Sequence, residues 1–335
     1  MKIQIINQTQ VRQLLPLDEC LKVMEEALKS LALGKAEMPL RQALWLPDKV
    51  GALGMMPAIM GELEVMGIKV VSVFPGNHET EYDSHQGSVM LFETKYGQPL
   101  AVIDASEITK IRTAAVSAVA TDLLARKDAG DLAILGTGTQ GSAHLQAMSL
   151  VRKIHRVRVW DLYPNSARRF AEQESKKYSF VVEIMEKVFD AVSGADIICT
   201  TSAATEPILF GDWIMEGVHI NAVGACFKTA RELDSQAVAR SRLFVDLRES
   251  TVNEAGDFIL AKEEGKIDEN HILGEIGDIL TGKLVGRQTE KEITLFKSLG
   301  LAVEDIASAK YIYQKALEKG IGASVEFVGK RHSND

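Results

Sequence analysis

The distribution of apolar and polar positions divides the chain into two regions with different periodicities. The first region begins with a short apolar run at residues 3–6, which predicts a strand. A helix follows, which opens at Asp18, carries Leu and Met at helical spacing and ends near Gly34. Residues 39–103 then contain short segments rich in β-forming residues, bounded by Pro, Gly, Asn and Asp. This pattern predicts an antiparallel-leaning sheet in an α+β domain.

From Asp131 onward, apolar strands alternate with helices. A helix rich in small residues, from about Ser106 to Leu124, precedes this second region and is suited to close packing. The candidate strands are residues 132–135, 156–160, 195–200, 218–223 and 242–246. Intervening helices are predicted at 184–193 and 231–240, and a later helix runs from about Val303 to Lys319. Such alternation predicts a parallel, doubly wound α/β sheet.

The strand at residues 132–135 leads directly into a glycine motif, and a helical pattern follows it. The motif reads Gly136, Thr137, Gly138, Thr139, Gln140, Gly141. Its first glycine allows a tight turn, its second leaves the backbone open to a pyrophosphate, and its third lets the helix pack close to the strand. Free N–H groups at the helix N-terminus attract the phosphates. The motif therefore predicts a dinucleotide cofactor.

An acid at the end of the next strand indicates which dinucleotide is bound. Asp161 stands at about the spacing expected for the carboxylate that holds the adenosine ribose. Because it would repel a 2′-phosphate, we predict NAD rather than NADP. Arg168 and Arg169 follow a turn or two later and leave NADP open as an alternative.

Composition and charge narrow the classes of function. The 335 residues suffice for two domains, and the net charge of −8 offers no broad basic surface for nucleic acid. No stretch of about 20 uncharged apolar residues is present, and the N-terminus lacks the apolar core of a signal peptide. Cys20, Cys199 and Cys226 form no paired motif, and no spacing suggests a metal site. We expect a cytoplasmic protein that binds neither membranes nor nucleic acid.

An ordered set of motifs covers nearly the whole chain. The segments are 67–77, 85–87, 111–115, 136–141, 196–201 and 293–305. Together they resemble the ornithine cyclodeaminase/mu-crystallin family, which also includes amino-acid dehydrogenases and ketimine reductases. The resemblance implies a Rossmann domain inserted into a smaller α+β domain that binds substrate and forms a homodimer. It places the substrate-binding and dimerisation domain at 1–120, completed by 312–335, and the NAD-binding domain at 121–311.

The resemblance also implies a clamp for the carboxylate of the substrate. Three basic residues match the family positions that meet this carboxylate: Arg41, Lys69 and Arg112. Lys69 stands in an otherwise apolar strand, so it must lie at an edge, reach outward or face a polar cavity. Arg112 stands among small and apolar residues of a helix. From the residues alone, exposed surface charges remain the alternative.

On the cofactor side, the resemblance places Arg112 and Thr113 near the pyrophosphate. It places Thr200 or Thr201 at a strand end near the dinucleotide, with Val223 after the next strand. The remaining candidate contacts are Ser84, from the substrate domain, and Ser298, near the nicotinamide. Serine and threonine at strand ends commonly satisfy backbone groups instead, so this alternative stays open.

Two departures from the family pattern concern acids that cyclodeaminases carry. Cys226 takes the place of an aspartate that handles protons on the substrate amine, and Gly54 aligns with a glutamate. Cys226 remains a candidate catalytic residue, although no general base is adjacent and a buried cysteine commonly packs as an apolar side chain. His85 and His78 are candidate proton donors, with structural or exposed histidines as the alternative.

These observations favour an NAD(H)-dependent reductase of an imino acid or ketimine, or an amino-acid dehydrogenase that runs the reverse reaction. The cofactor would supply the hydride, and the protein would supply orientation and charge. One alternative is a cyclodeaminase, a lyase that regenerates NAD in each turnover. Another is a non-enzymatic small-molecule binding protein of the mu-crystallin type. Net consumption of NADH with an imine distinguishes the first hypothesis from the other two.

Overall fold

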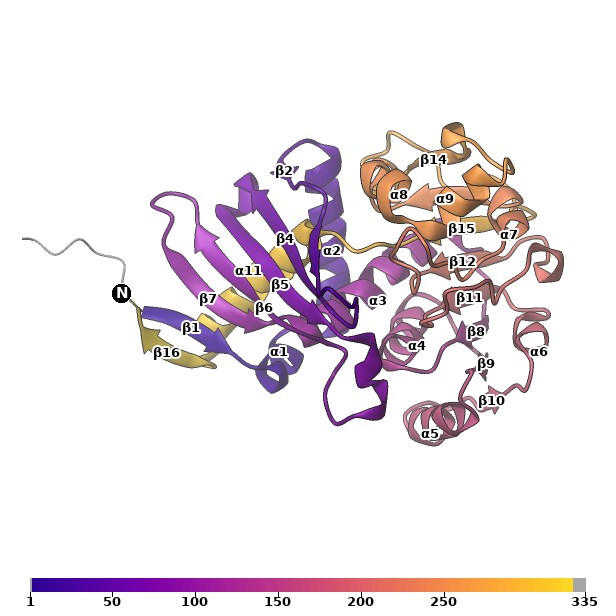
Figure 1. Ribbon diagram of the computed structural model, residues 1–335, viewed down its shortest axis with the longest axis horizontal. Coiled ribbons are helices and arrows are strands. Elements are labelled where there is room, and N and C mark those ends of the chain that lie inside the picture. The colour runs from indigo at the N-terminus through magenta and orange to yellow at the C-terminus, as the bar shows by residue number, and fades with distance from the viewer. Residues whose placement is uncertain (1, 328–335) are drawn as a thin grey trace, which may run out of the picture. The chain divides into compact units, whose positions relative to one another are not determined.

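The computed structural model describes residues 2–327, apart from the side chains of residues 78 and 79. The chain divides into two compact units (Figure 1). The first unit comprises Met1–Arg112 and Leu301–Asp335, and the second comprises Thr113–Gly300. The boundaries expected from the sequence, at 120/121 and 311/312, fall inside two helices. The structure divides the chain at 112/113 and 300/301 instead, because the whole of the last helix packs on the sheet of the first unit.

An 8-stranded sheet with the order β16-β1-β7-β6-β5-β4-β2 forms the first unit, with β3 paired to β4. Its pairs are antiparallel except for β1 with β7. The strands are β1 (Lys2–Ile6), β2 (Ala36–Glu37), β3 (Gln42–Trp45), β4 (Ala52–Met60), β5 (Val65–Val73), β6 (His85–Glu93), β7 (Pro99–Asp104) and β16 (Ala323–Glu326). The helices are α1 (Gln8–Leu14), α2 (Leu17–Ala32), η1 (Gly61–Leu63), η2 (Pro75–Glu79), the start of α3 (Ala105–Leu124), and α11 (Ala302–Lys319).

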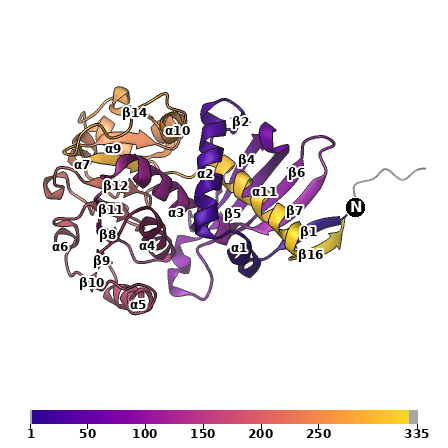
Figure 2. The ribbon, with the colours of Figure 1, turned by 180° about the vertical axis from the view of Figure 1, so that it is seen from behind.

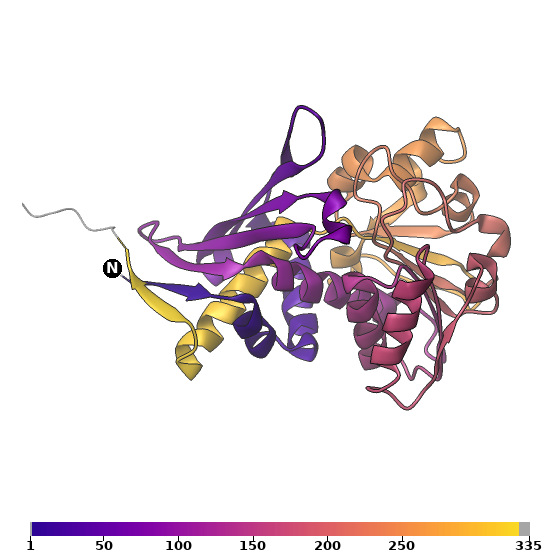
Figure 3. The same cartoon turned by 60° about the horizontal axis from the view of Figure 1, so that its bottom comes forward.

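The two longest helices wholly within this unit, α2 and α11, lie on one face of the sheet (Figure 2). Alternation along the strands buries Met56, Lys69 and Val89 on that face. In Figures 1 and 2, no helix formed by residues 2–327 covers the opposite face. The hairpin of β3 and β4 extends away from the rest of the unit (Figure 3). Antiparallel sheets commonly have one face covered in this way.

A second sheet of eight strands, in the order β10-β9-β8-β11-β12-β15-β13-β14, forms the other unit. All of its pairs are parallel. Its strands are β8 (Asp131–Leu135), β9 (Arg156–Trp160), β10 (Val182–Ile184), β11 (Ile197–Thr200), β12 (His219–Ala222), β13 (Arg242–Val245), β14 (Ile272–Glu275) and β15 (Thr294–Lys297). Leu135, Ile198 and Leu295 belong to its core.

Helices lie on both faces of this parallel sheet (Figure 1). They are the later part of α3, α4 (Thr139–Val151), α5 (Pro164–Glu174), α6 (Val188–Val192), η3 (Gly211–Trp213), α7 (Ser235–Ala239), α8 (Arg248–Glu254), α9 (Gly256–Glu263), η4 (Glu269–His271) and α10 (Ile276–Leu280). The α/β fold class, with a Rossmann-type parallel sheet and an α+β sheet, is confirmed. Among residues 2–327, no helix is both long and apolar enough to cross a bilayer.

Two helix predictions were wrong at their N-terminal ends. The segment 184–193 is helical only over Val188–Val192, because its start completes β10 beside β9. The segment 231–240 is helical only over Ser235–Ala239, because the Asp234 side chain accepts the N–H of Ala237 and caps the helix there. The strands β10, β14 and β15 were not predicted. Of these, β15 inserts between β12 and β13 although it follows β14 in the chain.

Candidate functional site

A buried cluster of four charged side chains lies in the first unit. Lys69 comes from the buried side of β5, Arg112 from α3, and Glu304 and Asp305 from the first turn of α11. Lys69 Nζ lies 2.6 Å from one Asp305 carboxylate oxygen, Oδ2. Arg112 Nε donates to the other, Oδ1, at 3.1 Å, and Arg112 Nη1 donates to Glu304 Oε2 at 3.0 Å. One carboxylate thus bridges two cations that are far apart in the sequence.

Burial is nearly complete for every member of this cluster. Lys69 and Arg112 are 3% and 4% exposed, and Glu304 and Asp305 are 0% exposed. Two cations against two carboxylates leave no net charge, which makes the burial of four ionised groups tolerable. Arg41 lies close enough for its charge to act on Lys69.

The environment of Lys69 lowers the pKa of its ammonium group toward neutral pH. Burial is the largest of the effects that lower the pKa of Lys69 to about 8; the charges of Arg112 and Arg41 act in the same direction, and Asp305 opposes them. Its Nζ also lies 3.5 Å from Thr109 Oγ1. A lysine with a pKa of about 8 can give up and recover a proton near neutral pH.

The two predicted proton donors and Ser84 belong to the same unit. Desolvation lowers the pKa of His85, and the positive charge of Lys69 acts in the same direction. Its Nδ1 lies 3.0 Å from Ser84 Oγ. The lowered pKa favours the neutral imidazole, and His85 lies within electrostatic reach of Lys69. The side chain of His78 lies outside the described part of the structure.

In the second unit, the glycine motif forms the predicted turn between β8 and α4. Gly136 has φ +100°, and a Cβ there would lie 2.8 Å from the backbone of Ser202. A Cβ on Gly141 would collide with the carbonyl of Gly136, so the third glycine permits the close approach of helix and turn. Gly138 has open space on the side where a Cβ would stand, and Thr139 beside it is exposed. The start of α4 therefore offers an accessible backbone to a phosphate.

Asp161 is tied to this loop by hydrogen bonds. Its Oδ2 accepts both the N–H and the hydroxyl of Thr137, each at 2.7 Å, and its Oδ1 accepts the N–H of Tyr163 at 2.9 Å. Arg168 and Arg169 bond within their own helix, to Asn165 and Ser166. The carboxylate is thus held at the ends of β8 and β9, where an adenosine ribose is expected.

The other cofactor candidates lie at or near the carboxyl ends of adjacent parallel strands, except Thr113 on α3 and Gln140 in the first turn of α4. Thr201 Oγ1 donates to the carbonyl of Gly136 at 2.8 Å, and Thr200 Oγ1 donates to Glu232 Oε2 at 2.8 Å. The N–H of Val223 donates to Thr200, and that of Ser298 donates to Ala222. The Gln140 carbonyl lies 2.8 Å from His144 Nδ1. The hydroxyls of Thr200 and Thr201 therefore already donate hydrogen bonds within the protein.

Cys226 is a half-buried free thiol whose Sγ donates to the carbonyl of Val223 at 3.4 Å. Lys297 Nζ donates to the carbonyl of the preceding residue, Ala225, at 2.6 Å. Among the described residues, no group of three or more His, Cys, Asp or Glu side chains could hold a metal ion.

Sequence reasoning missed the acidic half of the cluster in the first unit. Glu304 and Asp305 were included in a family motif but received no role. Their signal was an acidic pair inside the apolar run Leu-Ala-Val-Glu-Asp-Ile-Ala, residues 301–307, which a buried helix start does not carry without partners. The three residues predicted to form the clamp belong to the first unit, whereas the glycine motif, Asp161 and Cys226 belong to the second.

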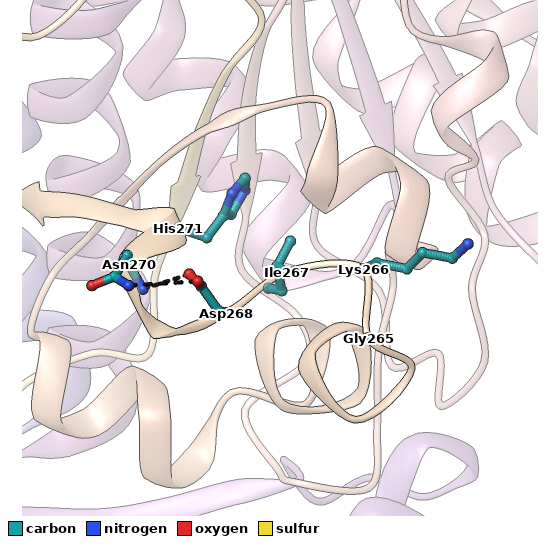
Figure 4. A pocket seen from close by; sticks show the side chains of 6 residues that line it. All are labelled: Gly265, Lys266, Ile267, Asp268, Asn270 and His271. Atoms are coloured by element: carbon teal, nitrogen blue, oxygen red, sulfur yellow. Dashed lines mark hydrogen bonds between the residues drawn. The ribbon is translucent and has the colours of Figure 1, made fainter.

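A shallow depression elsewhere in the second unit is formed by the loop that precedes β14 (Figure 4). Asp268 accepts the N–H of Asn270 at 2.8 Å, and His271 Nε2 lies 2.9 Å from the carbonyl of Val238. These polar groups stabilise the loop itself. None of the lining residues was predicted as a site residue, and the depression carries no functional assignment.

Comparison with known proteins places this geometry in context. The family model described as the ornithine cyclodeaminase/mu-crystallin family matches residues 1–320. The chain is 37% identical over 324 residues to Delta(1)-pyrroline-2-carboxylate reductase of Bacillus cereus, covering 96% of this chain and 99% of the relative. The structure of Thermococcus litoralis Delta(1)-pyrroline-2-carboxylate reductase with NADH and L-proline matches with a TM-score of 0.94 at 40% identity, covering 96% of this chain and 100% of that one. An archaeal alanine dehydrogenase dimer with bound NAD matches with a TM-score of 0.93 at 32% identity, covering 98% and 100%.

Proposed function

Because the chain belongs to the ornithine cyclodeaminase/mu-crystallin family, we propose that it is an NAD(H)-dependent oxidoreductase that reduces an imino acid to an L-amino acid. The substrate class we infer is a cyclic ketimine with a carboxylate next to the imine carbon, as in Delta(1)-pyrroline-2-carboxylate. Two relatives carry that reductase activity in their names. The observation that carries the proposal is the buried pair Lys69 and Arg112 bridged by Asp305.

The charge balance of the cluster supports recognition of a carboxylate. Lys69 and Arg112 are neutralised by Glu304 and Asp305, so they are held in place before a ligand binds. Arg41 adds a third cation close enough for its charge to act on Lys69, and we assign it to the same carboxylate. Preorganised cations reduce the entropy lost on binding, and guanidinium groups suit a planar carboxylate. Arg41, Lys69 and Arg112 together form the proposed clamp.

The proton required by the reaction has a candidate source in the same cluster. Reduction of an imine needs a hydride at carbon and a proton at nitrogen, and the nicotinamide supplies the hydride when it is bound. Lys69, with a pKa of about 8, holds a transferable proton at neutral pH, directly or through water. Asp305 keeps the Lys69 ammonium in position and favours its charged form.

The second unit fits a dinucleotide. The open side of Gly138 and the exposed start of α4 suit the pyrophosphate, and Asp161 suits the adenosine ribose. We propose that Thr137, Thr139, Gln140, Thr113, Thr201, Val223 and Ser298 complete this site, with Ser84 from the first unit. The NADH and NAD complexes of the two structural relatives support NAD as the cofactor.

A cyclodeaminase remains the alternative lyase reaction, which requires an acid to hold and deprotonate the substrate amine. Cys226 and Gly54 stand where that family branch carries acids, and neither offers a carboxylate. Gly54 lies within β4, paired with Val71 of β5. These two positions therefore favour reduction of a preformed imine over cyclisation of a diamino acid.

We further propose that the protein is a homodimer formed through the outer face of the first sheet. Met66 lies between Ile59 and Phe92 on neighbouring strands, and Ile68 pairs with Met90 in the next row. Ile59 is 49% exposed, and the other four side chains are half-buried. A contiguous apolar face of this kind is expected to be covered by a partner. The archaeal alanine dehydrogenase supports this proposal because it is described as a dimer.

The test of the proposed activity is an assay of NADH loss with a panel of imino acids, and of 2-oxo acids with ammonia or methylamine. The proposal expects sustained oxidation of NADH with at least one cyclic ketimine. Binding of ligands without turnover would instead support a non-enzymatic binding protein. Ammonia release from a diamino acid without net redox change would support the lyase.

A further inference from the structure

A second buried network of charges lies in the parallel-sheet unit. At its centre is Glu232, which is 0% exposed and stands in the segment between β12 and α7. Its Oε1 accepts the N–H and the hydroxyl of Ser202, at 2.7 and 2.6 Å. Its Oε2 accepts the Thr200 hydroxyl at 2.8 Å and the Gly224 N–H at 2.7 Å. One carboxylate thus joins the segments that follow β11 and β12.

The network continues to a third strand. Asp257 Oδ1 accepts the N–H of Glu232 at 2.8 Å, and Asp257 Oδ2 lies 2.8 Å from Lys297 Nζ. Lys297 is the last residue of β15, and its Nζ also donates to the carbonyl of Ala225 at 2.6 Å. Asp257 and Lys297 are 3% and 2% exposed. The carboxyl ends of β11, β12 and β15, three neighbours in the sheet, are therefore connected by buried side chains.

The order of strands indicates which part of the dinucleotide lies over these ends. The glycine motif follows β8, and Asp161 follows β9 on one side of it. Since β11 and β12 lie on the other side of β8, a dinucleotide that places its adenosine at β9 extends its nicotinamide half across β11 and β12. The segments that Glu232 joins are the ones this half would meet.

We propose that Glu232 is a positioning residue that fixes the loops after β11 and β12 in the arrangement that receives the nicotinamide half of the cofactor. This inference rests on the proposed function. Gly224 supports it, because a Cβ there would lie 2.6 Å from Glu232 Oε1, so the loop is closed tightly against the carboxylate. A loop held by four donors cannot shift without leaving buried polar groups unpaired.

The hydrogen bonds also explain why a carboxylate is needed. A backbone N–H reaches each of the two oxygens, and an N–H can only donate. Burial and the neighbouring Asp257 raise the pKa of Glu232, while Lys297 and the donated hydrogen bonds of Ser202 and Thr200 oppose that rise. An amide in place of the carboxylate would present an NH₂ group to one of these N–H donors. The hydrogen bonds that join the segments after β11 and β12 would then be broken without a change in side-chain volume.

The experiment compares Glu232→Gln with the native protein as full chains. Two ligands are titrated by calorimetry: NADH, and ADP-ribose, which lacks the nicotinamide. We expect Glu232→Gln to weaken NADH binding at least tenfold and ADP-ribose binding less than twofold. Glu216→Gln, an exposed Glu-to-Gln change in the same unit, is the matched control and should leave both affinities unchanged. Ser202→Ala, which removes one donor only, should weaken NADH binding to a smaller extent.

Several outcomes would overturn the inference. The first is that Glu232→Gln binds NADH with the same affinity as the native protein. The second is that Glu232→Gln loses affinity for NADH and for ADP-ribose to the same extent, which would indicate a general structural role. If Glu232→Gln does not fold, the Ser202→Ala variant provides the test. Unchanged affinity of that variant for NADH refutes the inference. Failure of the proposed function has a different signature, because the native protein would then either not bind NADH or bind it without oxidising it in the presence of any cyclic ketimine.

Discussion

Replacement of Lys69 by methionine removes the ammonium group and retains most of the side-chain volume. Asp305 keeps its hydrogen bond from Arg112 Nε at 3.1 Å, so the carboxylate is not left without a partner. The net charge of the four-residue cluster changes from zero to negative, and the substrate carboxylate then meets repulsion. Loss of one member of a buried charge pair costs about 2–5 kcal/mol in binding. With about 1.4 kcal/mol per factor of ten, this predicts a loss in kcat/KM of roughly 30-fold to several-thousandfold.

The pH profile separates this role from a structural one. Imine reduction requires the protonated form of Lys69, so kcat/KM of the native enzyme should fall as the pH rises through about 8. Oxidation of the amino acid requires the neutral amine as the base, so that reaction should accelerate through the same range. In Lys69→Met, the change in kcat/KM near pH 8, which we call the pH 8 limb of the profile, should be absent for both reduction and oxidation.

The assay follows NADH absorbance from pH 6 to 10 with a cyclic ketimine for the native protein, Lys69→Met and Lys69→Arg. Lys69→Arg keeps the charge but cannot titrate in this range, so it should bind substrate better than Lys69→Met and also lack the limb. Thermal unfolding of all three proteins checks the fold. The reasoning is refuted if folded Lys69→Met retains kcat/KM within threefold of native and keeps the limb near pH 8.

Three further predictions concern the cofactor, the thiol and the assembly. The native enzyme should prefer NADH to NADPH in kcat/KM, and Asp161→Ser should narrow that ratio at least tenfold; a native preference for NADPH would contradict the assignment of Asp161. Cys226→Ser should keep kcat/KM within about threefold, because the thiol serves only a weak hydrogen bond; complete inactivation would show a catalytic role. Light scattering should give twice the 36.7 kDa mass of the chain, and Ile68→Glu on the outer face should shift the mass toward a single chain; a native monomer would disprove the dimer.

Much of the fold could be predicted because local patterns determine it. Apolar runs of four or five residues, as at residues 132–135, predict buried parallel strands, and the turn after β8 requires its glycines for steric reasons. β15 could not be assigned in this way. Its insertion between β12 and β13 depends on sheet pairing between segments distant in the chain, which no local pattern reports.

The candidate site was predictable in part for a similar reason. Lys69 is conspicuous in an apolar strand, so the sequence alone draws attention to it. Its bond to Asp305 joins β5 to α11, and the pKa of about 8 results from burial and from charges contributed by three other segments. Glu232 gave no comparable signal, because its partners Ser202 and Gly224 are polar or small loop residues that occur in many turns.

The most direct test of the central claim gives the enzyme two substrates in parallel. In one reaction, Delta(1)-pyrroline-2-carboxylate is supplied with NADH, and in the other, ornithine is supplied with catalytic NAD; proline, ammonia and NADH are followed in both. We predict stoichiometric loss of NADH and formation of proline in the first reaction, and no proline or ammonia in the second. Sustained formation of proline and ammonia from ornithine, without net consumption of NADH, would contradict it.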